Sequence, residues 1–162
     1  MKPKPPTDLT DHRTVRKHFK REIRALENRH QPEQRNGKRF DCFTPSLLRL
    51  IYAFGKELHL NNSTDRLIKN SKVMDSNADC KVDTDNIFAV IIEGYIRECF
   101  EEKQLSSGQR SKYSRALDYA HQHKITVNWL GAFLKEVGGY EIAAKKYRVG
   151  QKENWVKRRA TF

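Results

Sequence analysis

The stretch that decides the fold runs from Lys38 to Leu58 and reads KRFDCFTPSLLRLIYAFGKEL. Residues 38–44 alternate in a way that predicts a short β-strand, with Phe40 and Cys42 on one face. Pro45 then suits the first position of a helix, where its missing N–H costs nothing. A strand this short is not stable alone, and no hairpin partner lies nearby. We therefore expect it to pair with the same strand of a second copy of the chain.

Two apolar segments predict the helices of the core. The helix after Pro45 has a wide apolar face made of Leu47, Leu48, Leu50, Ile51, Phe54 and Leu58. The second segment spans residues 86–102 and follows the capping cluster Asp83-Thr84-Asp85. Apolar residues cover most of its circumference, so it must be buried on nearly every side. In a chain of 162 residues, we expect that burial inside a dimer.

Positive charge is concentrated at the two ends of the chain. The net charge is +12. Residues 1–41 carry 12 Lys/Arg against 6 Asp/Glu, residues 42–105 carry 8 against 10, and residues 106–162 carry 12 against 4. A near-neutral middle between basic ends indicates a polyanionic partner, because +12 exceeds what solubility alone requires.

The N-terminal region predicts a basic amphipathic helix over about residues 11–28. Its apolar stripe is Val15, Phe19, Ile23 and Leu26. The rest of its surface is filled by cations, which are Arg13, Arg16, Lys17, Lys20, Arg21 and Arg24. Two interpretations stay open. The helix either docks on the core with a solvated basic face, or it is an arm that lies along a phosphate backbone.

The segment Arg39-Phe40-Asp41-Cys42-Phe43-Thr44-Pro45, with the apolar helix after it, resembles the strand and first helix of ribbon-helix-helix DNA-binding regulators of the Arc/MetJ/CopG type. The resemblance covers residues 38–58 and, in apolar pattern, residues 84–102. It implies a mainly α fold with one short strand. Its core would be a dimer in which the strands of two subunits form an antiparallel β-ribbon. Residues 1–37 and 103–162 would be basic helical extensions.

The same resemblance implies a site on the ribbon, whose outward side chains read base edges in the major groove. With Lys38 beside them, Arg39 can bond guanine, Asp41 can accept from cytosine N4, and Phe43 can contact a thymine methyl. An exposed cross-strand ion pair between Arg39 and Asp41 is the alternative.

The second core helix has two candidates. The family joins its helices by a short loop, whereas about 25 residues precede residues 84–102 here, so residues 63–74 are the other candidate. We favour residues 84–102 because residues 63–74 have little to bury. Asn62, Ser63 and Thr64 are then expected as phosphate contacts from an insertion at residues 59–83.

The C-terminal region predicts three helices over residues 109–121, 126–137 and 140–148. They form either a packed helical hairpin or a helix-turn-helix unit. Aromatic residues lie among the bases and can stack on unpaired nucleobases, and these are Tyr113, Tyr119, Tyr140, Tyr147 and Trp155. That gives the alternative function, an RNA or single-stranded nucleic-acid-binding protein. For Tyr119, Trp129 and Phe133 we expect core packing instead.

Sequence signatures of catalysis and metal binding are absent. The chain has no phosphate-binding glycine loop and no nucleophile elbow, and Cys42, Cys80 and Cys99 form no paired motif. The only close histidine pair, His121 and His123, has no carboxylate or cysteine cluster beside it in sequence. We expect no enzyme, no cofactor and no metal site. No apolar run approaches a membrane span, so we expect a cytoplasmic, nucleoid-associated protein.

The sequence therefore predicts a homodimeric, sequence-specific regulator of transcription that binds double-stranded DNA, from a bacterium, plasmid or phage, with conjugation genes as one class of target. Its expected organisation is a basic arm over residues 1–37, a ribbon-helix-helix core over residues 38–104 and a basic helical extension over residues 105–162. The DNA-binding residues would be those of the ribbon, the turn at Asn62 to Thr64, and four cations of the arm, which are Arg13, Arg16, Lys17 and Lys20.

Overall fold

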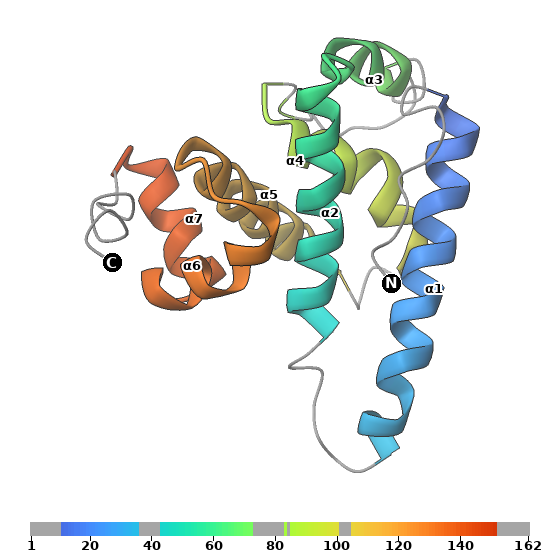
Figure 1. The fold of residues 1–162 in the computed structure, drawn as a ribbon, viewed down its shortest axis with the longest axis horizontal. Coiled ribbons are helices and arrows are strands. Elements are labelled where there is room, and N and C mark those ends of the chain that lie inside the picture. The colour runs from blue at the N-terminus through green and yellow to red at the C-terminus, as the bar shows by residue number, and fades with distance from the viewer. Residues whose placement is uncertain (1–10, 36–42, 73–82, 84, 101–104, 152–162) are drawn as a thin grey trace.

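The computed structural model describes residues 11–35, 43–72, 83, 85–100 and 105–151 (Figure 1). All of the regular elements in this part of the chain are helices. The first three are α1 (His12–Arg35), α2 (Phe43–Leu60) and α3 (Thr64–Lys72). A central segment follows, made of α4 (Ile87–Ile91), the π-helix η2 (Ile92–Ile96) and the 3₁₀-helix η3 (Arg97–Cys99). The C-terminal unit has α5 (Ser107–Gln122), the 3₁₀-helix η4 (Val127–Trp129), α6 (Leu130–Val137) and α7 (Tyr140–Arg148).

The predicted ribbon-helix-helix core is wrong. That core needs a β-ribbon, and no strand occurs among the described residues. Phe43 and Thr44, the last two residues of the expected strand, begin α2, while Lys38, Arg39, Phe40, Asp41 and Cys42 lie outside the described residues. Proline is tolerated anywhere in the first turn of a helix. Helix α2 can therefore begin at Phe43, two residues before Pro45. The short alternating pattern over residues 38–44 did not identify a strand.

Helices α1 and α2 lie side by side and run in opposite directions (Figure 1). The apolar stripe predicted for α1 is confirmed, because Val15, Phe19, Ile23 and Leu26 are all buried. The rings of Phe19 and Phe54 meet edge to face at 4.9 Å between centroids and join the two helices. Such aromatic pairs add stability beyond the area that they bury. One side of α1 is thus fixed to the core from Val15 to Leu26.

The central segment is buried within a single chain. It begins at Asn86, whose Oδ1 accepts hydrogen bonds from the N–H groups of Phe88 (3.0 Å) and Ala89 (3.1 Å). Asn86 Nδ2 donates to the Ser114 carbonyl on α5 at 3.3 Å. The buried residues of the segment are Ile87, Phe88, Val90, Ile91, Ile92, Tyr95 and Ile96. Helices α1, α2 and α5 all contact it, so its apolar surface needs no second copy of the chain.

The C-terminal helices match their predicted positions closely. Ser106 and Gln109 form a capping box at the start of α5, with each side chain bonded to the other's backbone N–H. Gly138 ends α6 with φ +106°, a left-handed conformation that glycine adopts readily. Helix α7 then packs back along α5. The helices predicted over residues 109–121 and 140–148 are confirmed, whereas the one predicted over residues 126–137 divides into the 3₁₀-helix η4 and the shorter α6.

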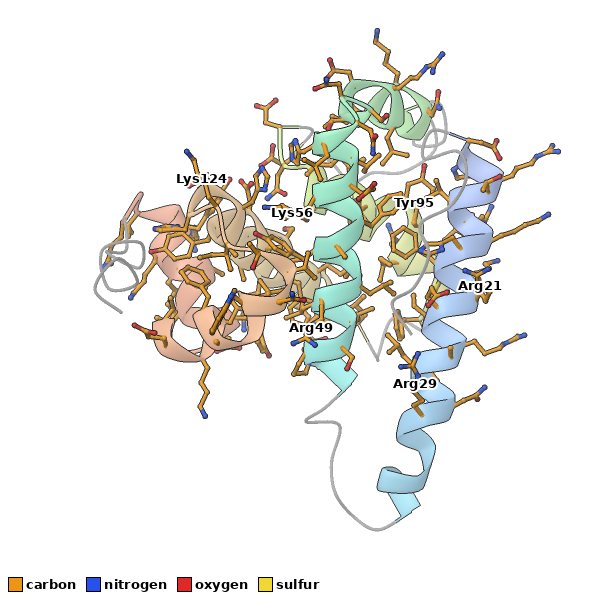
Figure 2. The ribbon with its side chains drawn as sticks, in the orientation of Figure 1. Arg21, Arg29, Arg49, Lys56, Tyr95 and Lys124 are labelled. Atoms are coloured by element: carbon orange, nitrogen blue, oxygen red, sulfur yellow. The ribbon has the colours of Figure 1, made fainter. Side chains whose placement is uncertain are left out.

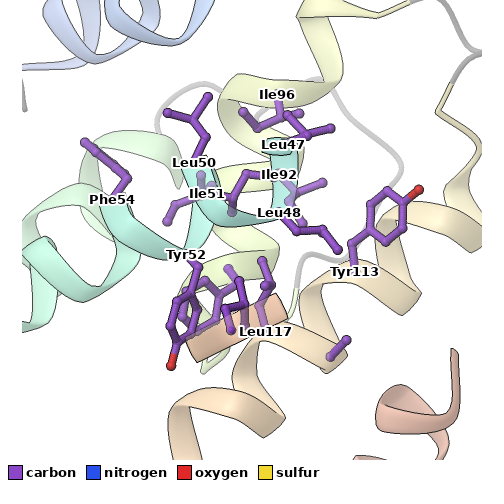
Figure 3. Packing of buried hydrophobic residues seen from close by; sticks show 14 of the residues in the cluster. Leu47, Leu48, Leu50, Ile51, Tyr52, Phe54, Ile92, Ile96, Tyr113 and Leu117 are labelled. Carbon is purple, nitrogen blue, oxygen red and sulfur yellow. The ribbon is translucent and has the colours of Figure 1, made fainter. Parts of the chain in front are cut away.

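Polar contacts as well as apolar packing join the C-terminal unit to the rest of the core. Arg110 Nε on α5 donates to Glu93 Oε1 on η2 at 2.7 Å, and Arg110 also donates to the Leu105 carbonyl. Tyr52 on α2 donates to the Ile125 carbonyl at 2.7 Å. Around them the buried side chains form one continuous cluster, and Figure 3 shows Leu48, Ile92 and Leu117 packing from three different elements.

A close approach between α2 and α4 gives the first prediction. A Cβ at Gly55 would lie 2.4 Å from Cε1 of the buried Phe88. We expect Gly55→Ala to lower the free energy of unfolding by about 1–3 kcal/mol, because overpacking outweighs the gain in helix propensity. Gly131→Ala is the matched control, since the nearest atom to its new methyl is the end of the Arg49 side chain at 3.7 Å. Urea unfolding of both variants measures the difference, and equal stability would contradict the packing described.

Candidate nucleic-acid interface

The exposed side of α1 carries a row of cations opposite its buried stripe. Arg13, Lys17, Lys20 and Arg24 follow the spacing i, i+4, i+7, i+11, which places them on one face of the helix. All four are exposed, and none forms an ion pair with another residue of the described chain. We call these four residues the α1 basic stripe. At 1.5 Å of rise per residue the stripe is about 16 Å long.

Two neighbouring arginines of α1 are engaged elsewhere. Arg21 lies beside the stripe on the side of α1 that points away from the other helices (Figure 2), and both its Nε and Nη2 donate to Glu22 Oε1. Arg16 pairs with Glu98 of η3. The prediction that Arg16 belongs to a binding face is therefore not supported by its geometry, because the guanidinium joins α1 to the central segment.

The other residues predicted to bind DNA are not brought together with the stripe by any described contact. Lys38, Arg39 and Asp41 lie outside the described residues, and Phe43 is the first residue of α2. Asn62 and Ser63 lie in the turn between α2 and α3, where Asn62 has φ +50°, and Thr64 is the first residue of α3. The Ser63 hydroxyl donates to the Asn61 carbonyl at 3.2 Å. Because no strand occurs among the described residues, we do not propose a base-reading ribbon.

The C-terminal aromatic residues divide into buried and exposed ones. Tyr113, Tyr119 and Phe133 are buried, so core packing is confirmed for Tyr119 and Phe133. Trp129 is 48% exposed, and the expectation that it packs in the core is wrong. A continuous α-helix would place it four residues before Phe133 on the same face. It belongs instead to η4, a 3₁₀ turn with three residues per turn, which changes the direction of its side chain.

Two histidines that lie far apart in the sequence stack at the end of α2 and α5. The His59 and His121 rings are 4.3 Å apart between centroids and 13° from parallel. His121 also lies edge-on to Phe88, and its Nδ1 is buried without a hydrogen-bond partner among the described residues. Burial, with the positive charges of His59 and Lys56 as smaller contributions, lowers the pKa of His121 to about 4. No sequence motif announces this pair.

Comparisons with protein-family models, curated proteins and solved structures find no match to this chain. Within the described residues, no group of three or more His, Cys, Asp or Glu side chains is placed to hold a metal ion. None of the helices described has the length and the apolar content needed to cross a bilayer. The charged and aromatic surfaces of the described chain are therefore the features from which we infer a function.

The histidine stack gives a prediction for acid stability. His121 has its pKa lowered in the folded state, so the unfolded chain binds more protons between pH 6.5 and about 4. Its contribution is present above pH 6.5 and is lost as the pH falls toward 4. We expect a loss of about 1–2 kcal/mol, discounted because the ring is partly solvated.

The measurement is the free energy of unfolding from pH 7.5 to 4 for the wild type and His121→Gln. Burial raises the pKa of Asp118, which contributes with the opposite sign as the pH falls, so the difference between the two proteins is the readout. His123→Gln is the control, because that ring lies against Tyr119 and Phe133 instead. An unchanged pH dependence in His121→Gln would contradict the assignment.

Proposed function

We propose that this protein binds double-stranded DNA through the α1 basic stripe and acts as a regulator of transcription. The observation that carries the proposal is the stripe itself, four exposed cations on one face of a helix whose other face is fixed to the core. Each strand of B-form DNA has one phosphate per about 3.4 Å of axis, so about 16 Å of helix matches roughly five phosphates. Lysine and arginine at such contacts displace condensed counterions, which drives binding.

The composition of the stripe differs from that of an ordinary solvated surface. A solvated surface usually mixes both signs of charge, and the exposed side of α3 does so with Asp65, Arg66 and Lys69. Between Arg13 and Arg24 the only acidic residue is Glu22, which is half-buried and already paired with Arg21. This uncompensated charge favours the interpretation of α1 as a phosphate contact over that of a solvated face.

The chemistry of the stripe sets its share of the mechanism. Contacts from lysine and arginine to phosphates position a protein on the duplex, whereas contacts to base edges specify the sequence. The stripe therefore supplies affinity and orientation. In the proposal the bound protein regulates by occupancy, blocking or recruiting the polymerase at its site, and it has a nucleoid-associated location.

Charge removal on α1 tests the proposal against a matched control. We expect Lys17→Gln/Lys20→Gln to lower the steepness of log K against log salt concentration by about 2, at 0.9 per phosphate contact. Arg66→Gln/Lys69→Gln removes the same charge from the exposed side of α3 and should leave the slope unchanged. Fluorescence anisotropy with a labelled duplex between 50 and 200 mM salt gives both slopes. Equal losses in the two variants would show that net charge, and not the stripe, governs binding.

The proposal includes a homodimer, which would place two stripes on one duplex. The sequence offered two reasons for a dimer, the ribbon and the helix that is apolar on nearly every side. No strand occurs among the described residues, and the apolar helix is buried within one chain. Light scattering, alone and with a duplex, tests the dimer. We expect two chains, each of 19.0 kDa, bound to one duplex. One chain per duplex at saturation would remove the dimer from the proposal and leave the stripe in place.

A further inference from the structure

A second cationic surface lies where α2 meets η4 and α6. The two segments that form it, residues 44–57 and 123–136, contain four cations against two carboxylates, Glu57 and Glu136. Their cations are Arg49, Lys56, Lys124 and Lys135. Figure 2 shows Arg49, Lys56 and Lys124 on the side of α2 away from α1. Together with the exposed Trp129, we call these residues the Trp129 surface.

Hydrogen bonds from α2 fix the loop that presents Trp129. The Ile125 carbonyl accepts from the Tyr52 hydroxyl at 2.7 Å and from Lys56 Nζ at 3.2 Å. Both donors come from α2, and Tyr52 is fully buried. Lys124 precedes this carbonyl, is exposed and has φ +55°. The loop is therefore attached to the core at its centre, so the surface is formed before any ligand arrives.

The guanidinium of Arg49 lies near the part of the chain that follows Trp129. One of its terminal nitrogens lies 3.7 Å from the position that a Cβ of Gly131 would take, two residues after Trp129. Arg49 is exposed. A half-exposed indole and a guanidinium beside the turn that follows it, on a surface with more cations than carboxylates, combine the two features of sites for single strands, an aromatic platform and cations for phosphates.

We infer that the Trp129 surface binds single-stranded nucleic acid, with an unpaired base stacked on the Trp129 indole and its phosphates held by Arg49 and Lys124. A paired base offers no free ring face to an indole, so this surface selects unpaired nucleotides, whereas the α1 basic stripe needs only phosphates. A protein partner would also use an exposed tryptophan. The excess of cations over carboxylates favours a polyanion as the occupant. The inference uses residues separate from those of the proposed function.

The tryptophan content of the chain provides a direct reporter. The protein has two tryptophans, Trp129 and Trp155, so Trp155→Phe leaves Trp129 as the only one. Titration of this variant with an oligonucleotide of about 12 nucleotides, within the usual site sizes, should quench its fluorescence. Oligo-dT and oligo-U arms separate DNA from RNA as the source of the single strand. A blunt duplex and heparin, which offer phosphates or sulfates without unpaired bases, should leave the fluorescence nearly unchanged.

Affinity for a labelled single strand completes the test. We expect Trp129→Ala to weaken it about 5- to 100-fold, the range for loss of one stacked base, and Trp129→Phe to retain most of it. Arg49→Gln should weaken it several-fold. Lys17→Gln/Lys20→Gln should weaken duplex binding and leave the quenching intact, which separates this surface from the stripe.

Three results would overturn the inference. One is an absence of quenching by both single strands, and another is unchanged single-strand affinity in Trp129→Ala. The third is equal quenching by heparin, which would show a plain polyanion site. If Trp129→Ala does not fold, the comparison of Trp129→Phe with Arg49→Gln in folded proteins decides, and an unaffected Arg49→Gln affinity would then contradict the proposed phosphate contact.

Discussion

Burial of the segment from Ile87 to Ile96 is the constraint on which the rest of the fold depends. Its side chains are apolar on nearly every side, so helices must cover it from several directions. Helices α1, α2 and α5 do this, and the Asn86 cap ties its first turn to α5. The π-helix at Ile92–Ile96 places Glu93 within reach of Arg110, so a charged pair closes one side of an otherwise apolar helix.

Hydrophobic periodicity predicted most of the helices and failed at the strand. The stripes of α1 and α2 were readable because a helix repeats its buried face every three or four residues over many turns. The alternation from Lys38 to Thr44 was a short signal of a different period, and Pro45 supports a helix that begins before it. The resemblance to ribbon-helix-helix regulators depended on that strand. The ribbon, the pairing between subunits and the base-reading residues were all inferred from this one local assignment.

The candidate interface was only partly predictable, because the periodicity of one helix does not show which of its side chains contact other helices. Arg13, Lys17 and Lys20 follow from the helical repeat, but nothing in the sequence shows that Arg16 turns toward Glu98. Trp129 was misplaced because a 3₁₀ turn interrupts the helical repeat just before α6. The stack of His59 on His121 joins residues of two helices distant in sequence. Contacts of this kind come from tertiary packing, which periodicity does not encode.

The attachment of α1 to the core would couple the proposed DNA binding to folding. Phe19 and Ile23 are buried on the opposite face of the helix that carries the stripe, so this helix is held in place only when the chain is folded. A duplex bound there would be a ligand of the native state only, and the free energy of unfolding would then rise with the concentration of free duplex. The nucleic acid would then act as a thermodynamic chaperone, and the resistance of the protein to heat or proteolysis would report how much of it is occupied.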